Sequence, residues 1–264
     1  MVAHLEHLVT ECAIPIIIAH RGASGYAPEN TFAAFDKALE LGFPDIEFDI
    51  HATKDGAPVV IHDATVDRTT DASTALSTGG PHPVAELTLA EVKRLDAGSW
   101  FGSEFAGQQV PTLEEVFGRY RERARFWIEV KVPGIGLEVK LLALMARYGV
   151  HDRCATISFE PAVVRELVPV GRGVFPVGLL TVKLDIETVD VVVRLGADGV
   201  YPHIMALTPE LAESAHARGL RVGVWGVETE EHVAHAVRCG VDGLVHNFPD
   251  VARAQLERLG VGRR

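Results

Sequence analysis

Short apolar runs alternate with amphipathic segments of helical length along most of the chain. This alternation is typical of parallel strands joined by helical crossovers. Strands are expected at Ile16–Ala19, Asp45–Ile50, Pro58–Ile61, Phe126–Val130, Ala155–Ser158, Phe175–Leu179, Gly199–Tyr201, Arg221–Trp225 and Gly243–Val245. Helices are expected at Thr31–Leu41, Leu113–Arg123, Leu137–Tyr148, Ala162–Val168, Glu187–Leu195, Pro209–Ala217, Glu231–Cys239 and Pro249–Leu259.

The expected strands exceed by one the number in a closed eight-stranded barrel. The segment between the second and third strands is too short for a helix, and its Asp55-Gly56 pair is a strong hairpin signal. The third strand is therefore expected to be the return arm of a hairpin, and the other strands and helices predict a (β/α)8 barrel. With Asp55 and Gly56 as the two turn residues, Asp49 lies opposite His62.

Residues 63–111 interrupt the alternation. This segment is rich in Thr, Ser, Gly and Pro, with one short helical piece at Leu89–Leu95. A structureless loop of this length is unusual in a compact domain. We therefore expect a single barrel domain over residues 1–264, with 63–111 as a small inserted subdomain or lid. Because the insertion follows His62 directly, it is expected over the active face.

Two carboxylates share one face of the second expected strand. Side chains alternate along a strand, so Glu47 and Asp49 point to one side while Ile46, Phe48 and Ile50 point to the other. The apolar face suits the surrounding helices, which leaves both acids inside the barrel. Two close, buried carboxylates do not both stay ionised without a partner. A hard divalent cation, Mg²⁺ or Ca²⁺, resolves this because both ions prefer oxygen ligands.

The strand at Phe126–Val130 repeats the pattern. Its polar face carries Trp127 and Glu129, followed by Lys131, so Glu129 is a candidate third ligand of the cation. The alternative is a structural ion pair inside the barrel between Lys131 and an acid. That alternative competes strongly for Lys131 and more weakly for Glu129.

Two histidines end strands at the face where such barrels carry their active sites. His20 closes the first strand and is followed by Arg21, whose forked guanidinium suits phosphate oxygens. His62 closes the hairpin. One imidazole can deprotonate an attacking hydroxyl or water while the other protonates a leaving alcohol. With a metal to neutralise phosphate charge, this set suits phosphoryl transfer.

Other polar residues at strand and helix ends have weaker signals. His203 and His246 end strands, so each is left open as a pocket residue, and a role for Asn247 is also open. Trp225 is a candidate wall for the apolar edge of a substrate, with core packing as the alternative. Asn30 or Thr31 is expected first of all to cap a helix, with a pocket role for Asn30 as the secondary possibility. The remaining histidines are expected to be structural or exposed.

Composition limits the partners. The net charge of −11 argues against nucleic acid and against stable association with an anionic membrane, because both need a basic surface. The cysteines Cys12, Cys154 and Cys239 show no disulfide or metal spacing, and residues 1–10 lack the pattern of a signal peptide. A cytoplasmic protein with a small-molecule substrate is therefore expected. No sequence feature indicates the oligomeric state.

The ordered set of motifs resembles the glycerophosphodiester phosphodiesterase family. The matching stretches are His20-Arg21-Gly22, Glu29-Asn30-Thr31, Glu47-x-Asp49, Thr53-Lys54-Asp55-Gly56, Val59-Val60-Ile61-His62-Asp63, Arg68-Thr69-Thr70, Pro111-Thr112-Leu113-Glu114-Glu115-Val116, Ile128-Glu129-Val130-Lys131, Ser158-Phe159 and Asp242-Gly243. The resemblance implies a TIM barrel with a small insertion, and hydrolysis of a glycerophosphodiester to an alcohol and glycerol 3-phosphate. The family's likeness to phosphoinositide phospholipases leaves a cyclic phosphate intermediate open beside direct attack by water.

The resemblance also implies residue roles. The acid/base pair would be His20 and His62. The ligands of one divalent cation would be Glu47, Asp49 and Glu129. Arg21 and Lys131 would contact phosphate.

The chain departs from the family pattern at three places that touch none of these positions. The family's Gly-Ala-Asp is Phe43-Pro44-Asp45 here, its Trp-Thr-Val is Trp225-Gly226-Val227, and its Thr-Asp-x-Pro is His246-Asn247-Phe248-Pro249. The last two lie where the family's pocket is expected, so they bear on substrate preference.

Two alternatives stay open. One is a phospholipase D-like hydrolase of lysophospholipids, which needs an apolar rim. The other is a non-catalytic module that binds a phosphodiester or a metal. Turnover of glycerophosphocholine separates the module from an enzyme, and choline release from lysophosphatidylcholine alone favours the lipid hydrolase.

Overall fold

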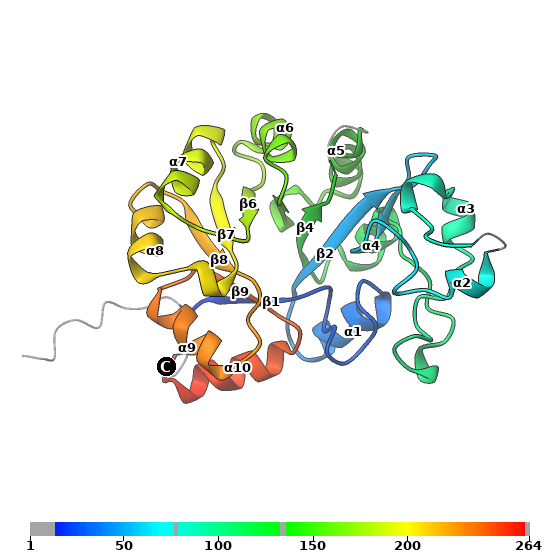
Figure 1. The fold of residues 1–264 in the computed structure, drawn as a ribbon, viewed down its shortest axis with the longest axis horizontal. Helices are drawn as coiled ribbons and strands as arrows, with labels where there is room; N and C mark the ends of the chain where they lie inside the picture. Colours follow the sequence, from blue (N-terminus) through cyan, green and yellow to red (C-terminus); the bar gives the residue numbers. More distant parts are fainter. Residues whose placement is uncertain (1–13, 77–78, 133–135, 262–264) are drawn as a thin grey trace, which may run out of the picture.

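A computed structural model describes residues 14–76, 79–132 and 136–261. Its parallel strands form a closed barrel surrounded by helices (Figure 1). The barrel strands are β1 (Ile16–Ala19), β2 (Asp45–Ala52), β4 (Arg125–Val130), β5 (Cys154–Ser158), β6 (Val177–Thr181), β7 (Gly199–Pro202), β8 (Arg221–Val224) and β9 (Gly243–His246). Neighbours pair in chain order, and β1 closes the sheet by pairing with both β9 and β2. The predicted (β/α)8 barrel is confirmed.

The closing seam is short. β1 pairs with β9 over four residues, whereas its pairing with β2 is the single contact of Ala19 with Ile46. On its other side β2 pairs with β4 over six residues, from Asp45 beside Arg125 to Ile50 beside Val130. The end of β1 is therefore held to β2 mostly by groups that lie beyond the strand.

Eight helices cover the barrel in the described residues. They are α1 (Phe32–Glu40), α4 (Leu113–Tyr120), α5 (Leu137–Tyr148), α6 (Pro161–Gly171), α7 (Ile186–Leu195), α8 (Pro209–His216), α9 (Glu230–Arg238) and α10 (Pro249–Arg258). Five of them (α1, α4, α7, α8 and α9) begin at a side-chain cap. Thr31 caps α1 by accepting a hydrogen bond from the Ala34 N–H. Thr112 and Glu115 form a reciprocal capping box at α4. Each cap satisfies N–H groups that the helix itself leaves without partners.

The apolar face of β2 packs against helices, as predicted. Ile46, Phe48 and Ile50 are almost completely buried in the main core. The Phe48 ring lies 5.8 Å from that of Phe35 on α1 and 6.1 Å from that of Phe126 on β4. Because side chains alternate along the strand, this packing turns Glu47 and Asp49 to the barrel interior.

The hairpin is present, but the predicted register is wrong. β3 (Pro58–Val60) runs antiparallel to β2, with His51 opposite Val59. Asp49 therefore faces Ile61, whose N–H donates to the Asp49 carbonyl at 3.1 Å. The loop has three residues rather than two, and Gly56 adopts the left-handed φ of 76° that this loop requires. His62 lies beyond the paired part of β3.

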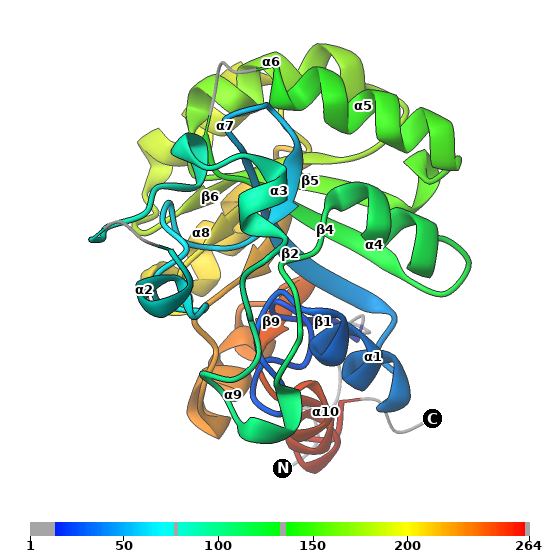
Figure 2. The same ribbon diagram turned by 90° about the vertical axis from the view of Figure 1, so that its right-hand side faces the viewer.

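The segment after His62 has its own elements and a small apolar core. It contains α2 (Ala72–Ala75), η1 (Val84–Glu86), α3 (Leu89–Val92) and η2 (Ser103–Phe105). Buried residues including Val66, Val92 and Val110 cluster with Val59 and Ile61 of the hairpin. In Figure 2, α3 lies beside β2, and α2 lies to the left of both. The role of the segment as a lid stays a prediction.

Other expectations concern the boundaries and the cysteines. β6 begins at Val177, two residues later than predicted, because Phe175 packs into the core before the strand starts and Pro176 separates them. Cys154 and Cys239 are free and buried, while Cys12 and the expected absence of a signal peptide at residues 1–10 lie outside the described residues. Within the described residues, no helix combines the length and apolar character needed to cross a bilayer.

Candidate active site

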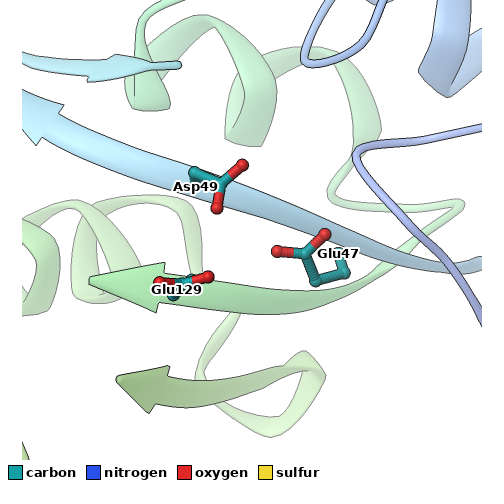
Figure 3. A group of neighbouring side chains, drawn as sticks. All are labelled: Glu47, Asp49 and Glu129. Atoms are coloured by element: carbon teal, nitrogen blue, oxygen red, sulfur yellow. The ribbon is translucent and has the colours of Figure 1, made fainter. Parts of the chain in front are cut away.

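Three carboxylates converge inside the barrel from two adjacent strands. Glu47 and Asp49 come from β2 and Glu129 from β4, where Asp49 and Glu129 are register neighbours (Figure 3). One oxygen from each lies within 4.8 Å of the others, and all three side chains are buried. The structure thus brings together the predicted ligand set.

The three acids have strongly shifted pKa values. Burial, and then the neighbouring Asp49, raises the pKa of Glu129 to about 7. Burial and the two other carboxylates raise the pKa of Glu47 well above its ordinary value. Burial alone raises the pKa of Asp49 too, but Lys131 and Arg21 lower it more, so its pKa lies below the ordinary value. Burial and mutual repulsion therefore disfavour the state in which all three carboxylates are ionised.

Two cationic side chains and one amide contact the cluster. Lys131 Nζ lies 2.9 Å from Asp49 Oδ1 and 2.6 Å from Glu129 Oε1. Arg21 Nε lies 3.4 Å from Asp49 Oδ2, and the Arg21 main-chain N–H donates to Glu47 Oε2 at 2.9 Å. Asn30 Nδ2 donates to Asp49 Oδ2 at 2.8 Å. The ion pair predicted as the alternative role of Lys131 is therefore present.

Tight backbone turns place these groups. Arg21 and Asn30 have left-handed φ values of 54° and 58°, and Gly22 between them in the sequence has a φ of 82°. A Cβ on Gly22 would lie 2.6 Å from the carbonyl carbon of Ala34 on α1. Only glycine permits this close approach, which turns the chain after β1 and leaves His20 and Arg21 at the barrel mouth.

Both predicted acid/base histidines have one ring nitrogen fixed by a hydrogen bond. The Nδ1 of His20 donates to Asn247 Oδ1 at 2.6 Å, and the Nδ1 of His62 donates to Asp63 Oδ1 at 2.6 Å. Each Nε2 is then the unprotonated nitrogen of a neutral ring. Burial and the adjacent Arg21 lower the pKa of His20 to about 4. Burial also lowers the pKa of His62, against the opposing effect of Asp49.

A cavity of about 250 Å³ lies beside the carboxylate cluster and is lined by both histidines, although neither Asp49 nor Lys131 lines it. The charged side carries His20, Arg21, Glu47, His62 and Glu129, and the apolar side carries Ile157, Phe159, Leu180, Trp225, Val227 and Val245. Trp225 donates through Nε1 to the Tyr201 carbonyl at 3.1 Å, and Phe159 meets its ring edge-on at 5.4 Å. A larger hollow, beside Pro58 and Lys140, contains none of the predicted site residues.

Comparison with known proteins identifies the family. Residues 20–251 match the model of the glycerophosphoryl diester phosphodiesterase family. The chain belongs to this family. The glycerophosphodiester phosphodiesterase of Caldanaerobacter subterraneus subsp. tengcongensis is 37% identical over 240 residues, which cover 89% of this chain and 95% of the relative. The predicted resemblance is confirmed, and the chain is a phosphoric diester hydrolase of the glycerophosphodiester phosphodiesterase class.

Solved structures of family members have the same fold. A glycerophosphodiester phosphodiesterase from Agrobacterium tumefaciens is 31% identical with a TM-score of 0.76, covering 91% of this chain and 100% of the other. A phosphodiesterase from Oleispira antarctica, solved with the product sn-glycerol-3-phosphate, is 26% identical with a TM-score of 0.83. That match covers 92% of this chain and 97% of the other.

The structure places the polar residues whose roles the sequence left open. Thr31 caps α1, as one of the two predicted candidates, while Asn30 binds Asp49. Asn247 and His203 both line the cavity. His246 does not line it; its Nδ1 instead accepts a hydrogen bond from the Phe248 N–H at 2.9 Å. The positions of these residues at strand ends identified them as candidates but did not indicate where their side chains point.

Charged residues outside the predicted set complete the surroundings of the site. Glu29 accepts from Arg21 Nη1 at 2.8 Å, and Asp63 accepts from His62. Arg68 donates to both of these carboxylates. The motifs Glu29-Asn30-Thr31 and Arg68-Thr69-Thr70 were among the matching stretches, but no pattern in the sequence indicates that their charges lie together.

Proposed function

We propose that the chain hydrolyses glycerophosphodiesters to an alcohol and glycerol 3-phosphate, with one divalent cation and two-histidine acid/base catalysis. One arrangement carries this proposal: His20 and His62 line the same cavity as Glu47 and Glu129 of the buried carboxylate cluster, and each histidine is held by a hydrogen bond at Nδ1 rather than at Nε2. Family membership supports the reaction class. The product complex of the Oleispira antarctica protein supports glycerol 3-phosphate as a ligand of this fold.

The carboxylate cluster fits a hard divalent cation. Glu47, Asp49 and Glu129 offer only oxygen ligands, as Mg²⁺ and Ca²⁺ prefer. The raised pKa values of Glu47 and Glu129 mean that added positive charge would favour their ionised forms. When bound, such a cation would neutralise charge on the phosphate and polarise it. The choice between Mg²⁺ and Ca²⁺ is a matter for a metal panel.

The protein's own residues divide the remaining work. His20, with its pKa of about 4, is neutral near pH 7 and suits the base that deprotonates the attacking hydroxyl or water. Burial lowers the pKa of His62 as well, but Asp49 and the Asp63 carboxylate at its Nδ1 oppose that shift. We therefore assign to His62 the acid that must donate to the leaving alcohol. Arg21 and Lys131 would orient the phosphate oxygens. Trp225 would bound the substrate on the apolar side.

The nucleophile distinguishes two versions of this mechanism. Attack by the neighbouring glycerol hydroxyl gives a cyclic phosphate that water then opens, whereas direct attack by water gives glycerol 3-phosphate in one step. Rapid quenching followed by phosphorus NMR would detect the cyclic species. Its absence during the first turnovers would favour direct attack.

The deciding experiment is turnover by histidine variants. We expect His20→Ala and His62→Ala each to lower kcat for glycerophosphocholine by about 10²-fold or more. The control is His216→Ala. His216 lies on α8, where its imidazole pairs with Asp242, and its removal should leave kcat unchanged. Near-wild-type turnover in either test variant would remove that histidine from the mechanism, and tight binding without product would support a non-catalytic module.

Hydrolysis of lysophospholipids is the second candidate, favoured by the apolar side of the cavity. His203 lines both this cavity and a second hollow of about 530 Å³, whose wall includes the exposed side chains of Val182 and Met205. These apolar groups would suit an acyl chain. Choline release from lysophosphatidylcholine but not from glycerophosphocholine would select this candidate, and the reverse result would reject it.

A further inference from the structure

The guanidinium group of Arg68 donates hydrogen bonds to two carboxylates at the edge of the site. Arg68 donates from Nε to Asp63 Oδ2 at 2.7 Å and from Nη2 to Asp63 Oδ1 at 2.9 Å. It donates from Nη1 to Glu29 Oε2 at 2.9 Å and from Nη2 to Glu29 Oε1 at 2.8 Å. Both contacts are bidentate, the geometry that fixes a carboxylate plane most firmly.

Each of these carboxylates in turn holds a residue of the proposed mechanism. Asp63 Oδ1 accepts from His62 Nδ1 at 2.6 Å, and Glu29 Oε1 accepts from Arg21 Nη1 at 2.8 Å. Arg68 Nη2 donates to these same two oxygens, Asp63 Oδ1 and Glu29 Oε1. The orientations of the His62 ring and the Arg21 guanidinium therefore share one support, which comes from the start of the segment 63–111.

Arg68 itself has little capacity left for substrate. Of its five N–H donors, four are used by the two carboxylates, so no fork of two parallel donors remains for a phosphate group. It is also absent from the residues that line the cavity. Its side chain is 45% exposed, and an ion pair at that exposure adds little to folding stability.

We infer that Arg68 is a positioning residue that sets the proposed acid and the proposed phosphate-binding arginine together. This inference rests on the proposed function. Without Arg68, Asp63 and Glu29 each lose a bidentate partner, and both carboxylates can rotate. The His62 ring then loses its fixed orientation, which lowers kcat. The Arg21 guanidinium loses its fixed orientation as well, which raises KM. A single structural ion pair would not produce both effects.

The test compares Arg68→Ala with Arg68→Lys on glycerophosphocholine. We expect Arg68→Ala to lower kcat by about 10- to 100-fold, as small misplacements of catalytic groups commonly do, and to raise KM. Arg68→Lys should restore little of the lost kcat, because one ammonium group cannot make a bidentate contact with each of two carboxylates. Guanidinium chloride at millimolar concentration should partly rescue Arg68→Ala, while sodium chloride at equal ionic strength should not.

The matched control is Arg119→Ala. Arg119 is 49% exposed and pairs with Asp36 on α1, away from the cavity residues, so its loss should leave kcat and KM unchanged. If Arg68→Ala stays within twofold of wild type in both constants, the inference is overturned. An activity loss that guanidinium does not rescue, and that parallels a lower Tm, would also overturn it by showing a merely structural role. If Arg68→Ala does not fold, Arg68→Lys carries the test.

A second readout separates this inference from the proposed function. The His62 Nδ1 proton can be followed by NMR and assigned with His62→Ala. We expect its resonance to weaken or vanish in Arg68→Ala and to persist in Arg119→Ala. A wild-type chain without turnover would defeat the proposed function, yet the resonance would still decide whether Arg68 holds the ring. An unchanged resonance in Arg68→Ala would overturn the inference.

Discussion

Binding of a divalent cation to the carboxylate cluster should raise the free energy of unfolding by an amount that follows from mass action. A ligand that binds only the native state at 100 times its Kd adds about 2.7 kcal/mol to the free energy of unfolding. For 264 residues the unfolding entropy is about 0.55 kcal/mol per kelvin. Saturating Mg²⁺ or Ca²⁺ should therefore raise Tm by about 5 °C relative to the protein in EDTA.

The pH dependence of this shift follows from Glu129. Its pKa is raised to about 7, so at lower pH a cation must displace a proton from this carboxyl group. Between pH 8 and pH 6 the apparent affinity should fall by roughly tenfold, which removes about 1.4 kcal/mol of stabilisation. At a fixed metal concentration, the Tm shift at pH 6 should be smaller than that at pH 8 by about 2–3 °C.

Differential scanning calorimetry of two matched variants tests the assignment. Glu129→Gln keeps the side-chain shape but removes one charged ligand, so its metal-induced shift should largely disappear. Glu257→Gln changes an exposed acid on α10 and should keep the full shift. A Tm that ignores both cations up to tens of millimolar, or a full shift in Glu129→Gln, would refute the cation site.

Two further predictions concern backbone and loop positions. Gly22→Ala should lower kcat at least about tenfold, because the new Cβ meets the Ala34 backbone at 2.6 Å and displaces the turn after β1. The control is Gly219→Ala, which should keep wild-type kcat because Gly219 also has a positive φ, of 77°, but has open space around it. Equal activity of the two variants would contradict this account. Asp96→Asn should cost about 1–3 kcal/mol in denaturant unfolding near pH 7, because its carboxylate accepts hydrogen bonds from Gly98, Ser99 and Gly107. Burial alone raises the pKa of Asp96, but those bonds lower it below the ordinary value, so the stabilisation is present above about pH 4 and is lost as pH falls further; a difference between wild type and variant that does not shrink in acid would argue against it.

The barrel and its acidic interior could be predicted because period-two alternation fixes the faces of a strand. In β2, the burial of Ile46, Phe48 and Ile50 against helices leaves Glu47 and Asp49 no other side. The same rule placed Glu129 on the neighbouring strand. Hydrophobic burial decides these positions, and it is readable from residue type alone.

The hairpin register could not be fixed in this way. Asp55-Gly56 is compatible with a two-residue and a three-residue loop, and Gly56 takes a left-handed conformation in either. The difference of one residue moves the partner of Asp49 from His62 to Ile61. His62 still reaches the cavity, because the chain has left the paired strand by that point.

The charge network around Arg68 was beyond sequence reasoning for a different reason. Glu29 and Arg68 lie 39 residues apart on segments without a periodic pattern. Loop conformation, which local propensity sets poorly, decides which carboxylate each guanidinium meets. The same holds for Asn247, whose contact with His20 spans 227 residues.

The barrel seam and the acidic cluster have one group in common. Beyond the single Ala19–Ile46 pair, two hydrogen bonds continue the contact between the end of β1 and β2: the Arg21 N–H donates to the Glu47 side chain, and the Gly22 N–H donates to the Glu47 main-chain carbonyl at 3.3 Å. Protonating or ligating the Glu47 side chain therefore alters one of these two hydrogen bonds. Closure of the barrel and the ligand state of the site are therefore thermodynamically linked through Glu47.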